Sequence, residues 1–254
     1  MKTYPSDMTD SQWKIIEKQL PAWQRTRKIS LRSIFNALLY LNKAGCQWRM
    51  LPREYPKWQT VYYYFRVWKD HGVMEELSQF CTEQTRMKKG RQPSPSLGIV
   101  DAQSVKTSFQ GGFRGYDGNK RIVGRKRHIV VDTNGWIMGV LVQSAHHHEN
   151  RLFELMCREL NRNFPRLEKI IADTGYRGEF ANEQAKKHGW NLQIVPRSEF
   201  KEFKVVPKRW IVERTFAWLG GYRRLSKDFE RLLDSSRSLI HLANIATTIK
   251  IFPN

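Results

Sequence analysis

The sequence is short of acidic residues. Asp and Glu number 24 against 44 Lys and Arg in 254 residues, which gives a formal net charge of +20. An excess of this size repels itself in the folded state and usually reflects a polyanionic partner, so we expect a nucleic acid. Ribosomal and histone-like proteins are equally basic. The charge therefore indicates nucleic-acid binding but does not indicate catalysis.

Long apolar runs and paired cysteines are missing as well. No stretch approaches the roughly 18 apolar residues of a membrane-spanning helix, and no signal peptide opens the chain, so a membrane is the weaker alternative partner. Cys46, Cys81 and Cys157 are odd in number, far apart and in no metal-ligand spacing. We expect free thiols in a reducing compartment, which the bacterial cytoplasm near the nucleoid would provide.

What is present suits a folded protein: 40% hydrophobic residues and nine tryptophans can build a core. The first part of the chain reads as helical. Thr9 and Gln12 form a capping box, Ser30 is a candidate cap for a second helix, and Gly45 ends it. A third helix is expected at about 57–70, with polar and basic residues on one face: Tyr62, Tyr63, Arg66 and Lys69.

Three short helices predict a helix-turn-helix-like DNA-binding domain over residues 1–85. The alternative is an ordinary helical bundle with a solvated face, since the connector at 52–56 is long for a helix-turn-helix. Residues 86–96 are basic and then rich in Pro and Ser, which predicts a linker.

After the linker, the expected elements alternate between strands and helices. Asn134-Gly135 is a strong hairpin signal between two of the strands. The order predicts a mixed sheet flanked by helices, an α+β or α/β domain over 97–233, followed by a C-terminal helix at 234–254 that packs on it or on a partner subunit. Strands are expected at 97–100, 126–132, 136–142, 167–172 and 192–195, and helices at 149–163, 180–188 and 207–219.

Three acids are candidates for a metal centre. Asp101 and Asp173 each end a predicted strand, where a lone Asp is usually a turn residue. Glu213 lies on or beside the apolar stripe of its helix, where an ion pair with Arg209 or Arg214 is the plainer explanation. If the three carboxylates converge, they can hold two divalent metal ions for phosphodiester chemistry.

Long strings of the sequence resemble one family, the DDE transposases of bacterial insertion sequences, in the group numbered five within the broader four/five group. The similarity runs nearly end to end. The strings that carry it are YPSDMTDSQWKIIEKQLP, GCQWRMLPREYPKWQTVYYYFRVWKDHG, DAQSVKT, RGYDGNKRIVGRKRHIVVDTNG, ADTGYRG and VERTFAWLGGYRRLSKDFE.

The resemblance implies a ribonuclease-H-like fold with Asp101, Asp173 and Glu213 as catalytic acids and metal ligands. It implies two Mg²⁺ ions, for which Mn²⁺ can substitute. The implied activity is binding of terminal inverted repeats, hydrolytic cleavage of the element ends and joining of the 3′-hydroxyl to target DNA. Double-stranded DNA is the implied partner, and bringing two ends together favours a homodimer or larger assembly. Position 102 is Ala where the family pattern suggests Ser.

Basic residues near the acids are candidates for DNA contact. Glycines interleave the first set, whose alternative interpretation is a solvated loop. The predicted contacts there are Lys106, Arg114, Lys120, Arg121, Arg125, Lys126 and Arg127, and near the third acid they are Arg209, Arg223, Arg224 and Lys227. Related transposases place a Tyr, an Arg and a Lys around the Glu. Arg209 matches the Arg, whereas Val206 and Gly220 stand at the other two positions.

Two other functions share these features. A two-metal nuclease would have the same acids but would join no product, and a DNA-binding regulator descended from a transposase would cleave nothing.

The run His146 to His148 suggests a metal site, but three adjacent side chains cannot all face one ion on a regular element, so we expect a loop or helix start.

Overall fold

A computed structural model of the protein describes residues 4–20, 29–108, 111–148, 152–195 and 208–252. Its sheet has the strand order β4-β3-β1-β5-β6, with the short β2 paired to the start of β3. β1, β3 and β4 are antiparallel, and β5 and β6 run parallel to β1. The strands are β1 Leu97–Lys106, β2 Gly115–Asp117, β3 Ile122–Val131, β4 Ile137–Ser144, β5 Lys169–Ala172 and β6 Asn191–Ile194.

Three antiparallel strands followed by two parallel ones on the other side of the first strand is the ribonuclease-H-like arrangement that was expected. The β3–β4 hairpin turns at Asn134-Gly135 as predicted, and Gly135 has a φ of 89°, a conformation that favours glycine. The predicted strand at 126–132 starts four residues earlier in the structure, at Ile122, because residues 122–125 also pair with β2 and β1.

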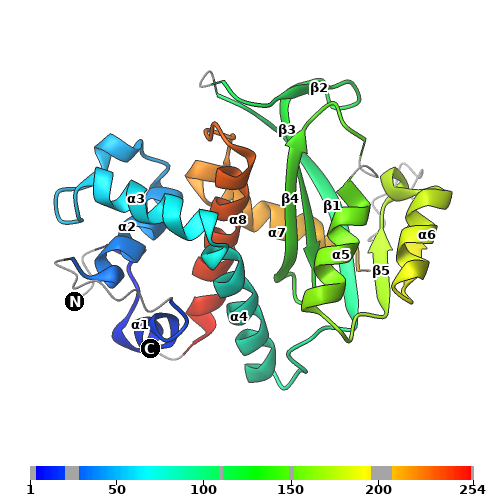
Figure 1. Ribbon diagram of the computed structural model, residues 1–254, viewed down its shortest axis with the longest axis horizontal. Helices are drawn as coiled ribbons and strands as arrows, with labels where there is room; N and C mark the ends of the chain where they lie inside the picture. The colour runs from blue at the N-terminus through cyan, green and yellow to red at the C-terminus, as the bar shows by residue number, and fades with distance from the viewer. Residues whose placement is uncertain (1–3, 21–28, 109–110, 149–151, 196–207, 253–254) are drawn as a thin grey trace.

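Helices cover both faces of the sheet (Figure 1). α5 and α6 close one face around a cluster of Val100, Val130 and Leu141. α4, α7 and α8 close the other face, where Ile99 and Ile129 point. The helices are α1 Asp10–Glu17, α2 Leu31–Ala44, α3 Trp58–Asp70, α4 Val73–Lys88, α5 Phe153–Asn163, α6 Glu179–Lys187, α7 Trp210–Gly220 and α8 Leu233–Thr248, with short 3₁₀ turns η1 Trp48–Met50, η3 Thr174–Tyr176, η4 Arg223–Leu225 and η5 Ile249–Ile251.

The predicted N-terminal helices are present as α1, α2 and α3. The Thr9–Gln12 capping box has both of its hydrogen bonds, and Gly45 caps α2 with a φ of 72°. A side chain on Gly45 would also collide with Arg223 of η4, 2.7 Å from its Cβ position. Helix α4 was not predicted, because its buried Thr, Ser and Cys residues weaken its apolar period.

The helical part and the sheet share one hydrophobic core. Buried side chains from α1, α2 and α3, the sheet, α7 and α8 belong to a single cluster. Side-chain hydrogen bonds reinforce the contact: Asn42 of α2 donates to the carbonyl of Leu239 (3.0 Å), and Gln12 of α1 donates to that of Ile249 (3.2 Å). The described residues of the N-terminal helices therefore pack on the sheet part of the chain through α4 and α8, and α8 is buried within this chain (Figure 1).

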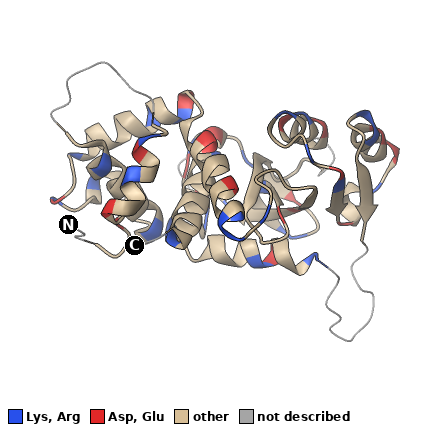
Figure 2. Ribbon diagram, turned by 90° about the horizontal axis from the view of Figure 1, so that it is seen from below, with Lys and Arg blue, Asp and Glu red and all other residues tan. Residues whose placement is uncertain are grey.

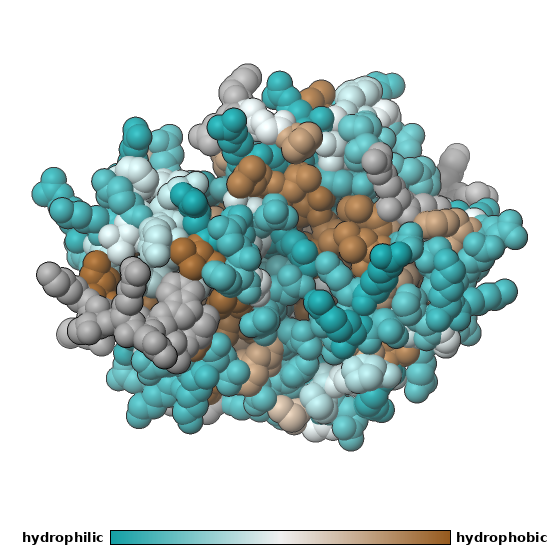
Figure 3. All heavy atoms as spheres, viewed as in Figure 1, coloured by the Kyte–Doolittle hydropathy of each residue, from teal (hydrophilic) through white to brown (hydrophobic). Residues whose placement is uncertain are grey.

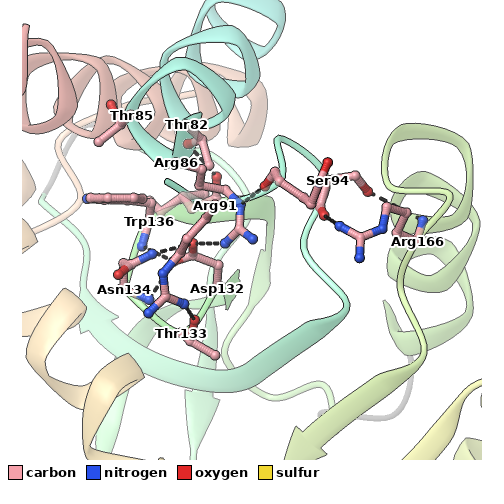
Figure 4. Close-up of polar contacts among 12 residues, drawn as sticks. Thr82, Thr85, Arg86, Arg91, Ser94, Asp132, Thr133, Asn134, Trp136 and Arg166 are labelled. Carbon is pink, nitrogen blue, oxygen red and sulfur yellow. Dashed lines mark hydrogen bonds and ion pairs between the residues drawn. The ribbon is translucent and has the colours of Figure 1, made fainter. Parts of the chain in front are cut away.

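The segment predicted as a linker is held against the sheet (Figure 4). Its first three residues complete α4, and Arg86 forms a buried ion pair with Asp132 at the end of β3. Arg91 donates to the Thr133 hydroxyl (2.7 Å), and Arg166 donates to the carbonyl of Ser94 (3.2 Å). This segment has few apolar residues because polar side chains, through ion pairs and hydrogen bonds, hold it in place.

The surface agrees with the composition. Figure 2 shows Lys and Arg on both the helical part and the sheet part. The face in Figure 3 is mostly hydrophilic, with hydrophobic residues gathered near its upper middle. Among the residues that the structure describes, no helix is long and apolar enough to cross a bilayer. Cys46, Cys81 and Cys157 are free thiols.

Candidate active site

The sheet register brings the first two acids together. β1 and β5 are parallel, with Ile99 beside Ile171. Continuing that register by two residues places Asp101, on β1, beside Asp173, the residue that follows β5. Side chains alternate between the faces of a strand, so Asp101 lies on the same face as Ile99, the face that α7 covers. The carboxyl end of β5 therefore completes a pair of aspartates under α7.

Helix α7 supplies the third acid and a cation. The Arg209 guanidinium, just before the helix, lies 4.0 Å from Asp101 Oδ2, 3.7 Å from Asp173 Oδ2 and 3.8 Å from Glu213 Oε1. Arg209 and Glu213 are one helical turn apart, which aligns them on one side of α7. The structure thus brings all three sequence-predicted acids around a single guanidinium.

Asp101 is the buried member of the group. It is 8% exposed, and its pKa is raised to about 6, first by burial and then by the neighbouring Asp173 carboxylate. A hydrogen bond from the Ala102 amide and the charges of Arg209 and Lys120 oppose that rise. Lys120 reaches the same spot by donating to the carbonyl of Ala102 (3.1 Å). A carboxyl in this position favours a cation beside it.

Glu213 differs from its predicted setting. We expected an acid directed toward an apolar stripe, but its side chain is 59% exposed and its partner is Arg209. The core-facing side of α7 is occupied instead by Ile211, Val212 and Thr215. The plainer explanation, an ion pair with Arg209, is therefore present, and the same guanidinium also contacts the two aspartates.

The carboxylates fit divalent metal ions by their chemistry. Three carboxylates form a hard oxygen donor set of the kind that Mg²⁺ and Mn²⁺ accept. Burial and the neighbouring Asp173 carboxylate raise the pKa of Asp101, so a cation bound beside it would stabilise its charged form. Within the described residues, no group of three His, Cys, Asp or Glu side chains is spaced to hold an ion as it stands. The Arg209 guanidinium lies among the three acids.

A buried polar chain that the sequence analysis missed supports the Asp173 turn. His128 Nδ1 lies 2.9 Å from the Tyr176 hydroxyl, and His128 Nε2 lies 2.9 Å from Gln143 Nε2. Tyr176 ends the 3₁₀ turn that Asp173 caps by accepting from the Gly175 amide (2.9 Å). The strings KRHIVVD and ADTGYRG contain two of these residues, but only the sheet pairing shows that they meet.

Several predicted DNA contacts are buried and bonded to the protein itself. Arg125 pairs with Asp228 at 3.0 Å and donates to the carbonyls of Phe113 and Arg231. Arg127 donates to the carbonyl of Leu225 (2.7 Å). These side chains anchor β3 to the segment after α7, and as they stand they present no donor to a phosphate. The same correction, burial with a protein partner, applies to Lys126, Arg209 and Arg224.

The other predicted contacts remain accessible. One cavity is lined both by Tyr62, Arg66 and Lys69 of α3 and by Arg224, which is far from them in the sequence. His146 to His148 follow β4 in a turn, as expected. The side chains of Lys106, Arg114, Lys120, Arg121, Arg223, Lys227, Tyr62, Tyr63 and Arg66 are exposed, and Lys69 is half-buried. Val206 lies outside the described residues.

Two protein families match the chain. Residues 92–249 match the family described as "Transposase DDE domain", and residues 8–78 match "Putative transposase of IS4/5 family". A curated relative, "Putative transposase for insertion sequence element IS402" of Burkholderia cepacia, is 32% identical over 127 residues. The alignment covers 47% of this chain and 60% of that relative.

Solved structures with weak likeness include other transposases. The catalytic domain of Mos1 mariner transposase aligns with a TM-score of 0.28 at 9% identity over 70% of this chain and 90% of its own. The Drosophila P element transposase strand transfer complex aligns with a TM-score of 0.33 at 15% identity over 74% of this chain and 45% of its own. The ribonuclease-H-like assignment rests on the strand order. The first family match spans more than half of the chain, with the whole sheet and all three acids, and the protein therefore belongs to the DDE transposase family.

Proposed function

We propose that this chain is the transposase of a bacterial insertion sequence. It binds the terminal inverted repeats, cleaves the element ends by hydrolysis and joins the freed 3′-hydroxyl to target DNA by transesterification. The observation that carries the proposal is the convergence of Asp101, Asp173 and Glu213 around the Arg209 guanidinium, at distances of 3.7 to 4.0 Å. The family match supports the same activity.

The acids are proposed as catalytic residues and metal ligands. Two divalent ions, Mg²⁺ or in its place Mn²⁺, would activate the attacking oxygen and stabilise the leaving oxygen when bound by these carboxylates. Asp101 and Asp173 are fixed by adjacent parallel strands, whereas Glu213 is carried on the exposed side of α7. Rigid elements on two sides of the site position the carboxylates, which in-line displacement at a phosphate requires.

Exposed basic residues around the acids are proposed to grip the DNA backbone. Lys106 is the last residue of β1, and Lys120 and Arg121 lie just before β3, the strand that pairs with β1 along Asp101. Each phosphate neutralised by a Lys or Arg releases counterions, so these contacts should give binding a steep salt dependence. A dimer or larger assembly on DNA, in the bacterial cytoplasm near the nucleoid, completes the proposal.

The test is cleavage of a DNA fragment that carries the element ends. Asp101→Asn, Asp173→Asn and Glu213→Gln are each expected to reduce Mg²⁺-dependent cleavage by at least about a thousandfold while end binding persists, since each removes a charge that stabilises the reacting oxygens. Glu154→Gln is the control, because Glu154 lies on α5 and pairs with Arg158. Cleavage at the wild-type rate in any of the three variants would refute the assignment of that acid.

A strand-transfer assay separates the alternatives. A joined product between the element end and target DNA identifies a transposase, cleavage without joining identifies a nuclease, and end binding without cleavage identifies a regulator. End binding is best tested in the full chain. The first helices share a hydrophobic cluster with the sheet, and removing them would expose it.

A further inference from the structure

A cavity of about 960 Å³ opens between α3 and the segment that joins α7 to α8. Its size lies in the upper part of the roughly 300–1,000 Å³ range of ligand sites. Four aromatic side chains line it: Trp48, Trp58, Tyr62 and Phe229. Five basic ones join them: Arg49, Arg66, Lys69, Arg224 and Arg231.

The aromatic wall is held in place by its neighbours. Trp48 meets Tyr62 edge to face, with ring centroids 5.0 Å apart. The Arg49 guanidinium lies 5.4 Å from the Trp58 ring centroid. Because Trp48 and Arg49 belong to η1 while Trp58 and Tyr62 belong to α3, these contacts join two elements into one wall.

Arg224 forms the opposite side of the cavity. Its guanidinium is bonded to Glu230 (2.7 Å) and to the carbonyl of Cys46 (2.8 Å). The same group lies 5.8 Å from the ring centroids of Trp48 and of Phe229. The hydrogen bonds and the ring contacts both hold Arg224 in place. This side of the cavity is therefore pre-formed without a ligand.

The charge of the lining selects an anion. Arg224 is balanced by Glu230, and Lys69 is paired with Asp70, which leaves Arg49, Arg66 and Arg231 to give the cavity its positive charge. Their side chains are exposed at its edge. Aromatic rings inside and cations at the rim are the combination by which proteins bind single-stranded nucleic acid, with bases on the rings and phosphates on the cations.

We propose that this cavity binds unpaired nucleotides of a DNA strand, with bases stacked on Trp58 and Tyr62 and phosphates at Arg49, Arg66 and Arg231. A duplex does not meet this arrangement, because its base faces are stacked on one another and only an unpaired base can enter to lie against a ring. The inference rests on the proposed function for its ligand class, DNA, and adds a site apart from the three acids.

The test is binding of the full chain to a fluorescein-labelled single strand of oligo-dT, followed by anisotropy, beside a blunt hairpin duplex with the same number of nucleotides. Base stacking is worth about 1–3 kcal/mol per base, so Tyr62→Ala and Trp58→Ala should each weaken oligo-dT binding by about fivefold or more. Duplex binding should weaken less than oligo-dT binding, because an intact duplex presents no free base face to either ring. Phe180→Ala is the control, since Phe180 is 42% exposed, against 39% for Tyr62, but lies on α6.

Other results would overturn the proposal. They are the absence of oligo-dT binding by the wild-type chain, equal losses for oligo-dT and duplex, or the same effect from Phe180→Ala as from Tyr62→Ala. Circular dichroism checks folding, and Tyr62→Ala carries the test if Trp58→Ala does not fold, because Tyr62 is already part-exposed. Binding is measured without metal or cleavage, so the outcome does not depend on whether the chain cuts DNA.

Discussion

At the scale of the residue, Arg209 is the counter-ion of the candidate site. Its guanidinium lies within 4.0 Å of an oxygen of each of Asp101, Asp173 and Glu213. Arg209 is itself only 5% exposed, so its charge acts where water screens it weakly. The arginine therefore supports the aspartate pair while it competes with any other cation for the same oxygens.

Arg209→Gln should make the metal-free protein less stable and more responsive to metal. We expect a loss of about 1–3 kcal/mol without metal, because the carboxylates then repel each other without the nearest counter-charge. Adding Mg²⁺ or Mn²⁺ should raise the melting temperature more in the variant than in the wild type, because the ions no longer compete with the guanidinium. Thermal melts with and without metal measure both effects. Arg158→Gln, which removes a surface pair with Glu154, is the control. Equal gains in variant and wild type would contradict the competition.

His241 is a buried base with no hydrogen-bond partner on either ring nitrogen among the described residues. Burial, and then the charge of Arg237, lower its pKa to about 3. Unfolding restores a pKa near the usual 6.5. Below that pH the unfolded chain therefore binds a proton that His241 in the folded chain does not bind. With respect to His241, the free energy of unfolding is therefore highest above pH 6.5 and declines as the pH falls from 6.5 toward 3.

His241→Leu should therefore increase stability and flatten the acid side of the stability curve. A shift of one pKa unit corresponds to about 1.4 kcal/mol, so we expect a difference of about 2–4 kcal/mol between the pH dependences of the two proteins. Urea unfolding at pH 7.5 and pH 4.5 measures it. The charged groups around the adjacent cavity, Lys69, Asp70, Glu75, Asp234 and Arg237, are unchanged in the variant. Parallel curves for wild type and variant would show that His241 titrates normally.

Residue patterns predicted the positions of the two aspartates better than the setting of Glu213. The strand-end positions of Asp101 and Asp173 were readable from the apolar runs before them, and the register places them side by side. Glu213 seemed directed at a core because Phe216 and Ala217 are close in sequence, yet its side chain is 59% exposed. Burial of Arg125 and Arg127 could not be predicted, because their partners, Asp228 and carbonyls beyond α7, are about a hundred residues away.

At the scale of the element, the end of α4 is tied to the β3–β4 turn by the buried Arg86–Asp132 pair (Figure 4). Asp132 also accepts hydrogen bonds from the amides of Asn134 (2.8 Å) and Trp136 (3.0 Å), so one carboxylate shapes the hairpin and binds the helix. Because polar residues dominate this junction, the sequence predicts a linker there.

Asp132→Ala should destabilise the protein by about 3–5 kcal/mol, because it leaves the Arg86 guanidinium buried without its counter-ion. Arg91→Ala is the matched control: Arg91 bonds Thr133 in the same turn but is exposed, and its loss should cost less than about 1 kcal/mol. Chemical denaturation of both variants gives the comparison. Similar losses for the two would mean that the buried pair contributes no more than a surface contact.

At the scale of the whole molecule, the order of elements other than α4 and β2 was predictable, but their packing was not. Helix caps at Thr9 and Gly45 and the turn at Asn134-Gly135 are local signals and agree with the structure. Whether residues 1–85 stand apart depends on contacts over long sequence distances, such as Asn42 with Leu239. The domain boundaries remain a prediction: 1–85, 86–96, 97–233 and 234–254. The structure shows that the N-terminal helices, the sheet and α8 share one hydrophobic core.

A common core implies cooperative unfolding. Phe35 of α2 is fully buried in the cluster that also holds Ile99 and Ile129 of the sheet. Phe35→Ala should cost about 3–5 kcal/mol through the cavity that it leaves. Because helices and sheet share the cluster, hydrogen exchange should show that amides of β1 and β3 lose protection together with those of α2.

Phe180→Ala, at a side chain 42% exposed on α6, is the control and should change exchange little. If instead the α2 amides exchanged faster while β1 and β3 kept wild-type protection, the helical part would be a separate folding unit. Calorimetry gives the same comparison from the whole transition: one peak with equal calorimetric and van't Hoff enthalpies fits a shared core, and two peaks fit two units. A single unit would couple the proposed nucleotide site at α3 to the position of α7, since both helices pack on α8.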